Sequence, residues 1–284
     1  MQSRRLEGIK INNNNLNDED VIAFSKAFAS VQLRYIDFSF NQIGDRGALE
    51  LANTFPNSFS LNLNSNDLTD VSVKEIAKNG YSFLELNDNK IGDMGAAAFA
   101  NNTSLEILKI ENNHIGTKGA LAIAKNRSIN FLYISKNNIG DAGLSAIFQA
   151  NRVSYLHANH CNINGDHLTG LAKNYAIREL YLNNNLIGDT GAIELVKKTY
   201  DSLQLNDNKI GNNGAVALVN SALFLFLKNN NIGDEGAAGL AETSEVKYLY
   251  LENNCIGNFG LYVLESVRDK FRELTLNDQR KCIN

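Results

Sequence analysis

The stretch LEILKIENNHIGTKGALAIA, from Leu105 to Ala124, carries the pattern that decides the fold. Counted from Leu105, apolar residues stand at offsets 0, 3 and 5, followed by Asn at 8, Ile at 10, Gly at 11 and 14, and Ala at 15. Apolar positions two residues apart predict one face of a short strand, and later ones spaced by three or four predict one face of a helix. We therefore expect one strand and one helix in each copy of this pattern.

The same pattern returns along almost the whole chain, with a period close to 24 residues. Its offset-0 residues are Leu6, Leu33, Ser58, Tyr81, Leu105, Ile129, Val153, Ile177, Tyr200, Ala222, Val246 and Phe271. Such a period is typical of solenoids, in which each unit stacks on its neighbours and the chain remains one domain. We expect a single domain over residues 1–284, with about eleven full repeats over 6–270 and a partial repeat over 271–284.

Three polar or small positions of the repeat have expected structural roles. The Asn at offset 8, replaced once by Cys161, should turn the chain and bond backbone groups that would otherwise be unpaired. The Asp of Gly-Asp pairs such as Gly44-Asp45 should be the N-cap of the helix. The Gly at offset 14, for example Gly143 or Gly191, should let the helix pack closely against the core.

Composition excludes several classes of protein. The net charge is −4, with 27 basic and 31 acidic residues, so no nucleic-acid partner is expected. The chain lacks an apolar signal core at its N-terminus and any run of about 18 apolar residues, so neither a classical signal peptide nor membrane insertion is expected. Cys161, Cys255 and Cys282 are odd in number and scattered, which favours a reducing compartment over a disulfide framework.

The segments IGDRGALELA, IGTKGALAIA and IGDEGAAGLA, which begin at Ile43, Ile115 and Ile232, make the chain resemble leucine-rich-repeat proteins. They are similar to the ribonuclease-inhibitor-like class, and the literal Gly-Ala-Leu-Ala at 119–122 resembles the short GALA-type repeats of bacterial effector proteins. The resemblance implies an α/β solenoid, or horseshoe, with parallel strands on the concave face and short helices on the convex face.

Residues at offsets 2, 4, 6 and 7 should point outward from the concave side of the strands. Aromatic residues occupy 11 of these 48 positions but only 13 of the other 236. Because Tyr and Phe are enriched in the cores of protein interfaces, this enrichment predicts a partner-binding surface. The alternative is that strands favour aromatic residues and that stacking across strands stabilises the sheet. The predicted binding residues are Tyr35, Phe83, Phe131, Tyr133, Tyr155, His157, Tyr181, Phe224, Phe226, Tyr248 and Tyr250, with Glu85 and Glu179.

These residues include two expected clusters. The central cluster is Phe131, Tyr133, Tyr155, His157 and Tyr181, and the C-terminal cluster is Phe224, Phe226, Tyr248 and Tyr250. Ser202, Gln204 and Asn206 should form a polar gap between them. The same face positions carry nine acidic and four basic residues, a net charge of −5. This charge favours a protein partner with a basic surface or segment, although it also agrees with a merely solvated face.

The residues give no indication of catalysis. A metal site needs three or four converging ligands, whereas His157 should face outward and Cys161 inward, so no metal is expected. No Gly-Lys-Ser/Thr follows the Gly-Asp-x-Gly segments, so they are not phosphate loops. We expect no catalytic residue and no cofactor.

The sequence therefore favours a non-enzymatic module that binds a protein partner on its concave face. The resemblance implies a bacterial effector, either cytoplasmic or delivered to a host cytosol without a classical signal peptide. The alternative function is regulation of an enzyme, as a GTPase-activating or inhibitor-type leucine-rich-repeat protein.

Overall fold

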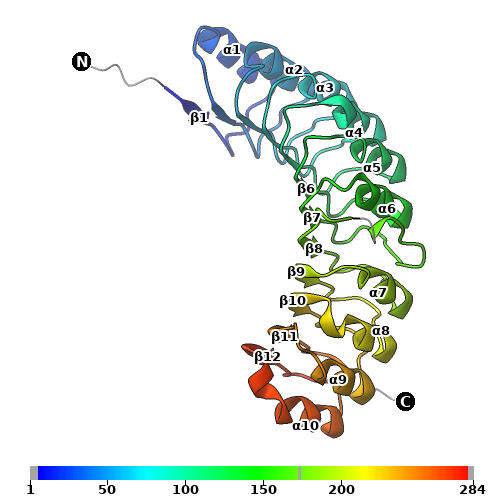
Figure 1. Ribbon diagram of the computed structural model, residues 1–284. Helices are drawn as coiled ribbons and strands as arrows, with labels where there is room; N and C mark the ends of the chain where they lie inside the picture. Colours follow the sequence, from blue (N-terminus) through cyan, green and yellow to red (C-terminus); the bar gives the residue numbers. More distant parts are fainter. Residues whose placement is uncertain (1–5, 172–173, 281–284) are drawn as a thin grey trace. The chain divides into compact units, whose positions relative to one another are not determined.

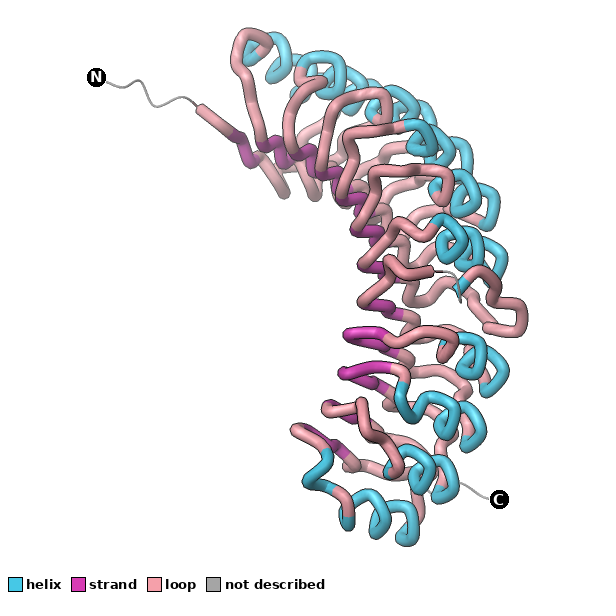
Figure 2. Tube along the Cα trace, in the orientation of Figure 1, coloured by secondary structure: helices cyan, strands magenta, loops and turns pink. Residues whose placement is uncertain are grey.

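A computed structural model describes residues 6–171 and 174–280. The chain divides into two compact units, Met1–Asn138 and Ile139–Asn284, which we call the N-terminal unit and the C-terminal unit. In each unit the strands line one side and the helices the opposite side (Figures 1 and 2).

The N-terminal unit contains six strands, each paired in parallel with the next along the chain. They are β1 (Gly8–Lys10), β2 (Tyr35–Asp37), β3 (Ser60–Asn62), β4 (Phe83–Glu85), β5 (Ile107–Lys109) and β6 (Phe131–Tyr133). The helices between them are α1 (Asp18–Phe28), α2 (Asp45–Thr54), α3 (Asp70–Ile76), α4 (Asp93–Ala98), the 3₁₀ turn η1 (Phe99–Asn101) and α5 (Thr117–Ile123).

The C-terminal unit repeats this arrangement, again with parallel neighbours in chain order. Its strands are β7 (Tyr155–His157), β8 (Glu179–Tyr181), β9 (Tyr200–Gln204), β10 (Ala222–Phe226), β11 (Tyr248–Tyr250) and β12 (Glu273–Thr275). Its helices are α6 (Gly140–Ala150), α7 (Asp189–Leu195), α8 (Asn212–Ala217), η3 (Leu218–Asn220), α9 (Asp234–Ala241), α10 (Asn258–Ser266) and η4 (Arg268–Lys270). The predicted fold class, an α/β repeat of parallel strands and short helices, is confirmed.

The core of each unit lies between its strands and its helices. Register joins equal offsets on neighbouring strands, for example Leu84 with Leu108. These mid-strand leucines are fully buried, as are helix residues such as Ala96 and Ala120. Every repeat thus adds one layer to a column of apolar side chains, and each layer is covered only by the layers beside it.

The offset-8 asparagines form the predicted buried ladder. The Asn89 amide donates to the carbonyls of Leu63 and Leu86 at 3.0 and 3.1 Å, and its oxygen accepts from the Leu68 backbone N–H at 3.0 Å. One side chain therefore satisfies backbone groups of two repeats. Gln279 takes this position in the last repeat, donating to Leu251 and Leu276, each at 2.9 Å.

The prediction that the Asp caps its own helix is wrong. The N-cap is the preceding glycine, as Gly92 is for α4, and the Asp is the first helical residue. Its carboxylate instead reaches the helix of the next repeat: Asp93 accepts from the backbone N–H groups of Gly116 and Gly119 at 2.7 and 2.8 Å. The next helix presents unpaired N–H groups and a partial positive charge there, which stabilise a carboxylate.

A second set of asparagines, not predicted from the sequence, caps helix C-termini. Asn126 donates to the carbonyls of Phe99 and Asn102 at 2.7 and 2.8 Å, and Asn174 donates to that of Phe148 at 2.7 Å. These carbonyls belong to the end of the preceding repeat's helical segment. The short helical segment α4–η1 is thus held by side chains of neighbouring repeats at both ends, since the Gly92 N–H donates to Asp70 at 2.6 Å and the Phe99 carbonyl accepts from Asn126.

The seventh repeat departs from the expected pattern, because its described residues contain no α-helix. Gly165 and Gly170 both have φ near +85°, a conformation that ends a right-handed helix. A Cβ on Gly165 would lie 2.6 Å from the Gly191 Cα, so only glycine allows this approach. The sequence signals were His167 at offset 14, in place of glycine, and the extra Gly170.

The cysteines differ in one respect from the expectation. Cys161 is fully buried, with its backbone N–H bonded to Asn185. Cys255 is disulfide-bonded, whereas the odd, scattered cysteine pattern predicted no disulfide framework. Cys282 lies outside the described residues. In the part of the chain that is described, no helix is long and apolar enough to cross a membrane.

Candidate functional site

We use the term strand face for the surface formed by the side chains at offsets 2, 4, 6 and 7. On the three-residue strands other than β1 the middle residue is buried while its two neighbours are not, as at Phe131, Leu132 and Tyr133. All thirteen predicted binding residues lie on such outward positions, on strands β2, β4, β6, β7, β8, β10 and β11. The side chains are therefore available at the surface; that they bind a partner stays a prediction.

Among the aromatic residues of the strand face, the two most exposed, Tyr35 and Phe40, lie near the start of the N-terminal unit. Tyr35 is 46% exposed and contacts Phe59, which is 41% exposed, with ring centroids 5.8 Å apart. Phe40 is 58% exposed and has φ +56°. Phe59 was missed from the sequence because it stands at offset 1, just before its strand, where the repeat pattern assigns no surface role.

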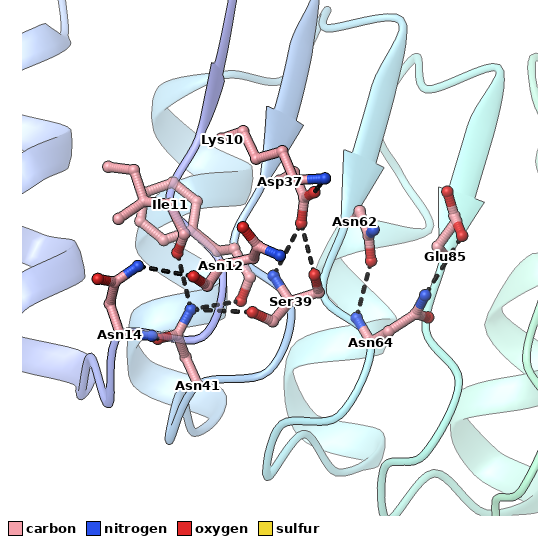
Figure 3. Close-up of polar contacts among 11 residues, drawn as sticks. Lys10, Ile11, Asn12, Asn14, Asp37, Ser39, Asn41, Asn62, Asn64 and Glu85 are labelled. Atoms are coloured by element: carbon pink, nitrogen blue, oxygen red, sulfur yellow. Dashed lines mark hydrogen bonds and ion pairs between the residues drawn. The ribbon is translucent and has the colours of Figure 1, made fainter.

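The Lys109 ammonium makes cation–π contacts with two aromatic rings of this unit. Its ammonium lies 5.0 Å from the centroid of Phe83 and 5.5 Å from that of Tyr133. It also lies 3.3 Å from the carboxylate of Glu85. Asn64 donates to the same carboxylate at 3.2 Å (Figure 3). Glu85 is therefore internally paired and is not a lone charge at the rim of the face.

The polar residues beside these rings are paired in the same way. The Lys10 ammonium lies 3.4 Å from the Asp37 carboxylate, which also accepts from the Ser39 hydroxyl at 2.6 Å (Figure 3). Glu111 is half-buried, and burial raises the pKa of its carboxyl. This part of the strand face is mostly neutralised by its own side chains.

In the C-terminal unit, three residues of the predicted central cluster meet. The His157 ring lies 4.0 Å from that of Tyr181 and 5.0 Å from that of Tyr155. The Tyr155 hydroxyl lies 3.1 Å from the His157 Nε2, and the Tyr181 hydroxyl donates to Glu179 at 2.9 Å. Burial, together with the bonds to Tyr155 and Glu179, raises the pKa of the Tyr181 phenol, which keeps it a donor. Phe131 and Tyr133 belong to the N-terminal unit.

The predicted C-terminal cluster consists of two stacked pairs on β10 and β11. Phe224 and Tyr248 have ring centroids 4.1 Å apart with planes 12° from parallel, and Phe226 and Tyr250 have centroids 4.4 Å apart with planes 3° from parallel. The Lys228 ammonium lies 5.4 Å from the Tyr250 ring and 2.6 Å from the carboxylate of Glu252.

The predicted polar gap is confirmed within this unit, since β9 lies between β8 and β10. Ser202 is in register with Glu179 on one side and Phe224 on the other. Gln204 is in register with Tyr181 and Phe226 and accepts from Asn183 at 3.0 Å.

The negative charge of the strand face is unequally divided. The N-terminal unit carries four of the nine acids and three of the four bases, and the C-terminal unit carries five acids and one base. The face charge is therefore −1 in the first unit and −4 in the second. Sequence alone gave the total, but not this division.

Metal binding has no structural support at the described positions. Within residues 6–171 and 174–280, no three His, Cys, Asp or Glu side chains gather closely enough to hold an ion. His157 lies on the strand face, whereas Cys161 is buried in the turn.

Comparison with known families agrees with this architecture. One leucine-rich-repeat family model matches residues 83–139, and another matches 32–52, 60–77, 176–196, 202–219 and 225–241. Together they cover more than half of the chain. This chain is a leucine-rich-repeat protein. The matches do not decide between the ribonuclease-inhibitor-like and GALA-type subclasses. No curated protein matches it.

Solved leucine-rich-repeat structures share the fold at low identity. The Arabidopsis receptor kinase HAESA, solved with the peptide hormone IDA and the co-receptor SERK1, is 18% identical over 99% of this chain and 48% of the receptor chain, with a TM-score of 0.57. An internalin from Listeria monocytogenes is 17% identical over 97% of this chain and 88% of its own, with a TM-score of 0.57. A chain of the complex of Latrophilin 3, Unc5D and FLRT2 is 16% identical over 98% and 77%, with a TM-score of 0.58. The chain spans only about half the length of the plant receptor chains that it matches.

Proposed function

We propose that this leucine-rich-repeat protein is a non-enzymatic module that binds a protein partner on its strand face. The observation that carries the proposal is that two stacked ring pairs, Phe224–Tyr248 and Phe226–Tyr250, are partly exposed on neighbouring strands. Parallel sheets normally have both faces covered, and exposed apolar surface of this kind usually marks an interaction site. Structures with the same fold include complexes with protein and peptide partners.

The competing explanation is that the rings only stabilise the sheet by stacking across strands. Phe40 argues against it as a full account. Phe40 is 58% exposed, and its ring stacks on no other ring in the described part of the chain. Its backbone has the left-handed φ of +56°. Such a residue costs stability, so stacking does not explain its presence.

The partner we propose carries a basic surface or segment, because the strand face of the C-terminal unit has a charge of −4. For the setting we propose a bacterial effector in a host cell, a proposal that rests on the Gly-Ala-Leu-Ala sequence at 119–122. No observation favours the enzyme-regulating alternative.

The test is to capture partners from a eukaryotic lysate on the full chain and to measure the affinity of a captured partner for variants. Tyr133→Ala, Tyr181→Ala and Phe226→Ala should weaken binding, by about 2 kcal/mol at a true hot spot, with little change in melting temperature. Phe259→Ala is the matched control, because Phe259 is 62% exposed on helix α10. Binding that depends on Phe259 and ignores the three strand residues would place the partner on the helix side and overturn the proposal.

A further inference from the structure

The stacked rings of Phe224 and Tyr248 leave one flat face turned toward β9. The two residues are register partners on β10 and β11, and their centroids are 4.1 Å apart. Because this distance is smaller than the spacing of about 4.8 Å between strands, the nearly parallel rings must face each other along the strand-to-strand direction. The second face of the Phe224 ring is therefore directed at the residue of β9 that is in register with Phe224.

That residue of β9 is a serine, whose side chain is small. Ser202 is in register with Phe224, and the next strand contributes Glu179 to the same row. Strands two apart are separated by roughly 9.6 Å, which leaves room for one planar group above Ser202, between the ring and the carboxylate. In the neighbouring row the planar amide of Gln204 takes the equivalent position between Tyr181 and Phe226.

The electrostatics of this position favour a cation. Glu179 accepts from the Tyr181 hydroxyl through Oε2. The nearby Arg178 lies 4.0 Å from the carboxylate of Asp201, and both of these side chains are largely exposed to solvent. The whole strand face of this unit carries a charge of −4. An incoming group would thus meet a ring face on one side and a carboxylate on the other.

We propose that the position above Ser202 binds an arginine side chain of the partner, with its guanidinium stacked on Phe224 and paired with Glu179. A guanidinium is planar, stays charged, stacks on aromatic faces and presents a fork of N–H donors to a carboxylate. A lysine ammonium has the charge without the flat shape. This deepens the proposed function, and the identity of the occupant as a protein segment rests on that function.

The position can be tested without knowing the partner. The full chain is titrated with N-acetyl-L-arginine N-methylamide while the ring resonances of Phe224 and Tyr248 are followed by NMR. The lysine analogue and the uncharged citrulline analogue serve as probes of charge and shape. We expect the arginine analogue to shift these resonances and to bind at least about ten-fold more tightly than either of the others. Equal affinity for arginine and citrulline would overturn the proposal.

Two variants locate the binding. Ser202→Leu fills the position and should abolish the shifts, and Glu179→Gln keeps the shape but removes the charge and should weaken binding roughly ten-fold. Ser60→Leu is the matched control, because Ser60 lies between Tyr35 and Phe83 in a row position of the N-terminal unit without a carboxylate in register. Arginine binding unchanged by both Ser202→Leu and Glu179→Gln would refute the assignment, whether or not Phe226→Ala reduces partner capture. Loss of the shifts in Ser202→Leu, with capture unaffected by Tyr133→Ala, Tyr181→Ala and Phe226→Ala, would support the arginine position and reject the proposed function.

Discussion

At the scale of the residue, offset 7, the last strand-face position of each repeat, has an unusual backbone conformation. Offset 7 has φ between +50° and +57° in all twelve repeats, including Asn112, Asn184 and Asn229. Asn and Asp tolerate this left-handed conformation better than other residues that carry a Cβ. Eight repeats place Asn or Asp at this position, and the exceptions are Phe40, Ser65, Lys136 and His160.

Replacing Phe40 should therefore make the protein more stable. Phe40→Asn is expected to raise the free energy of unfolding by about 1 kcal/mol, because asparagine is less strained at φ +56° and an exposed ring is removed. Urea denaturation followed by circular dichroism measures the change. The reverse exchange, Asn112→Phe, is the control and should lower stability by a similar amount. A less stable Phe40→Asn protein would mean that the ring supports the fold.

At the scale of the element, glycines set how closely each helix approaches its neighbour. A Cβ on Gly191 would lie 2.8 Å from Ile187 Cγ2 and 2.9 Å from the Cα of Gly165. The second contact is with backbone, which cannot move aside easily. A Cβ on Gly188, the N-cap of the same helix, would meet nothing nearer than the Lys209 carbonyl oxygen at 3.9 Å.

These two glycines make a matched pair for mutation. Gly191→Ala should lower the free energy of unfolding by about 1–3 kcal/mol through overpacking, and Gly191→Val by more. Gly188→Ala should change it by no more than about 0.5 kcal/mol. Thermal and urea unfolding of both variants measures the difference. Equal stabilities would show that α7 is not held against the seventh repeat as closely as described.

At the scale of the whole molecule, we propose that residues 1–284 unfold as one domain. Repeat proteins are stabilised mainly by contacts between adjacent repeats, so a defect in one repeat weakens a cooperative array. A Cβ on Gly47 in the N-terminal unit would lie 2.7 Å from Asp18 Oδ1, so Gly47→Ala there and Gly191→Ala in the C-terminal unit should each lower the midpoint of one shared calorimetric transition. Two transitions, with each variant shifting only its own, would instead establish two independent domains.

The sequence by itself determined what each repeat does within its own stretch of chain. The alternation of Leu84 and Leu86 predicted the strand, the offset-8 asparagines predicted a buried ladder, and the recurrent glycines predicted close helix packing. These features depend on period and residue type, which one repeat displays completely. The outward position of the thirteen candidate binding residues followed from the same alternation.

Tertiary structure decided which group each polar or aromatic side chain meets. The partner of Asp93 is an N–H 23 residues later, Lys109 lies between rings on two other strands, and the flat face of Phe224 is left uncovered because its neighbour is Ser202. The pattern of one repeat contains no information on these pairs, since they join residues in different repeats. The distance between the layers sets them, and that distance exists only once the repeats have stacked.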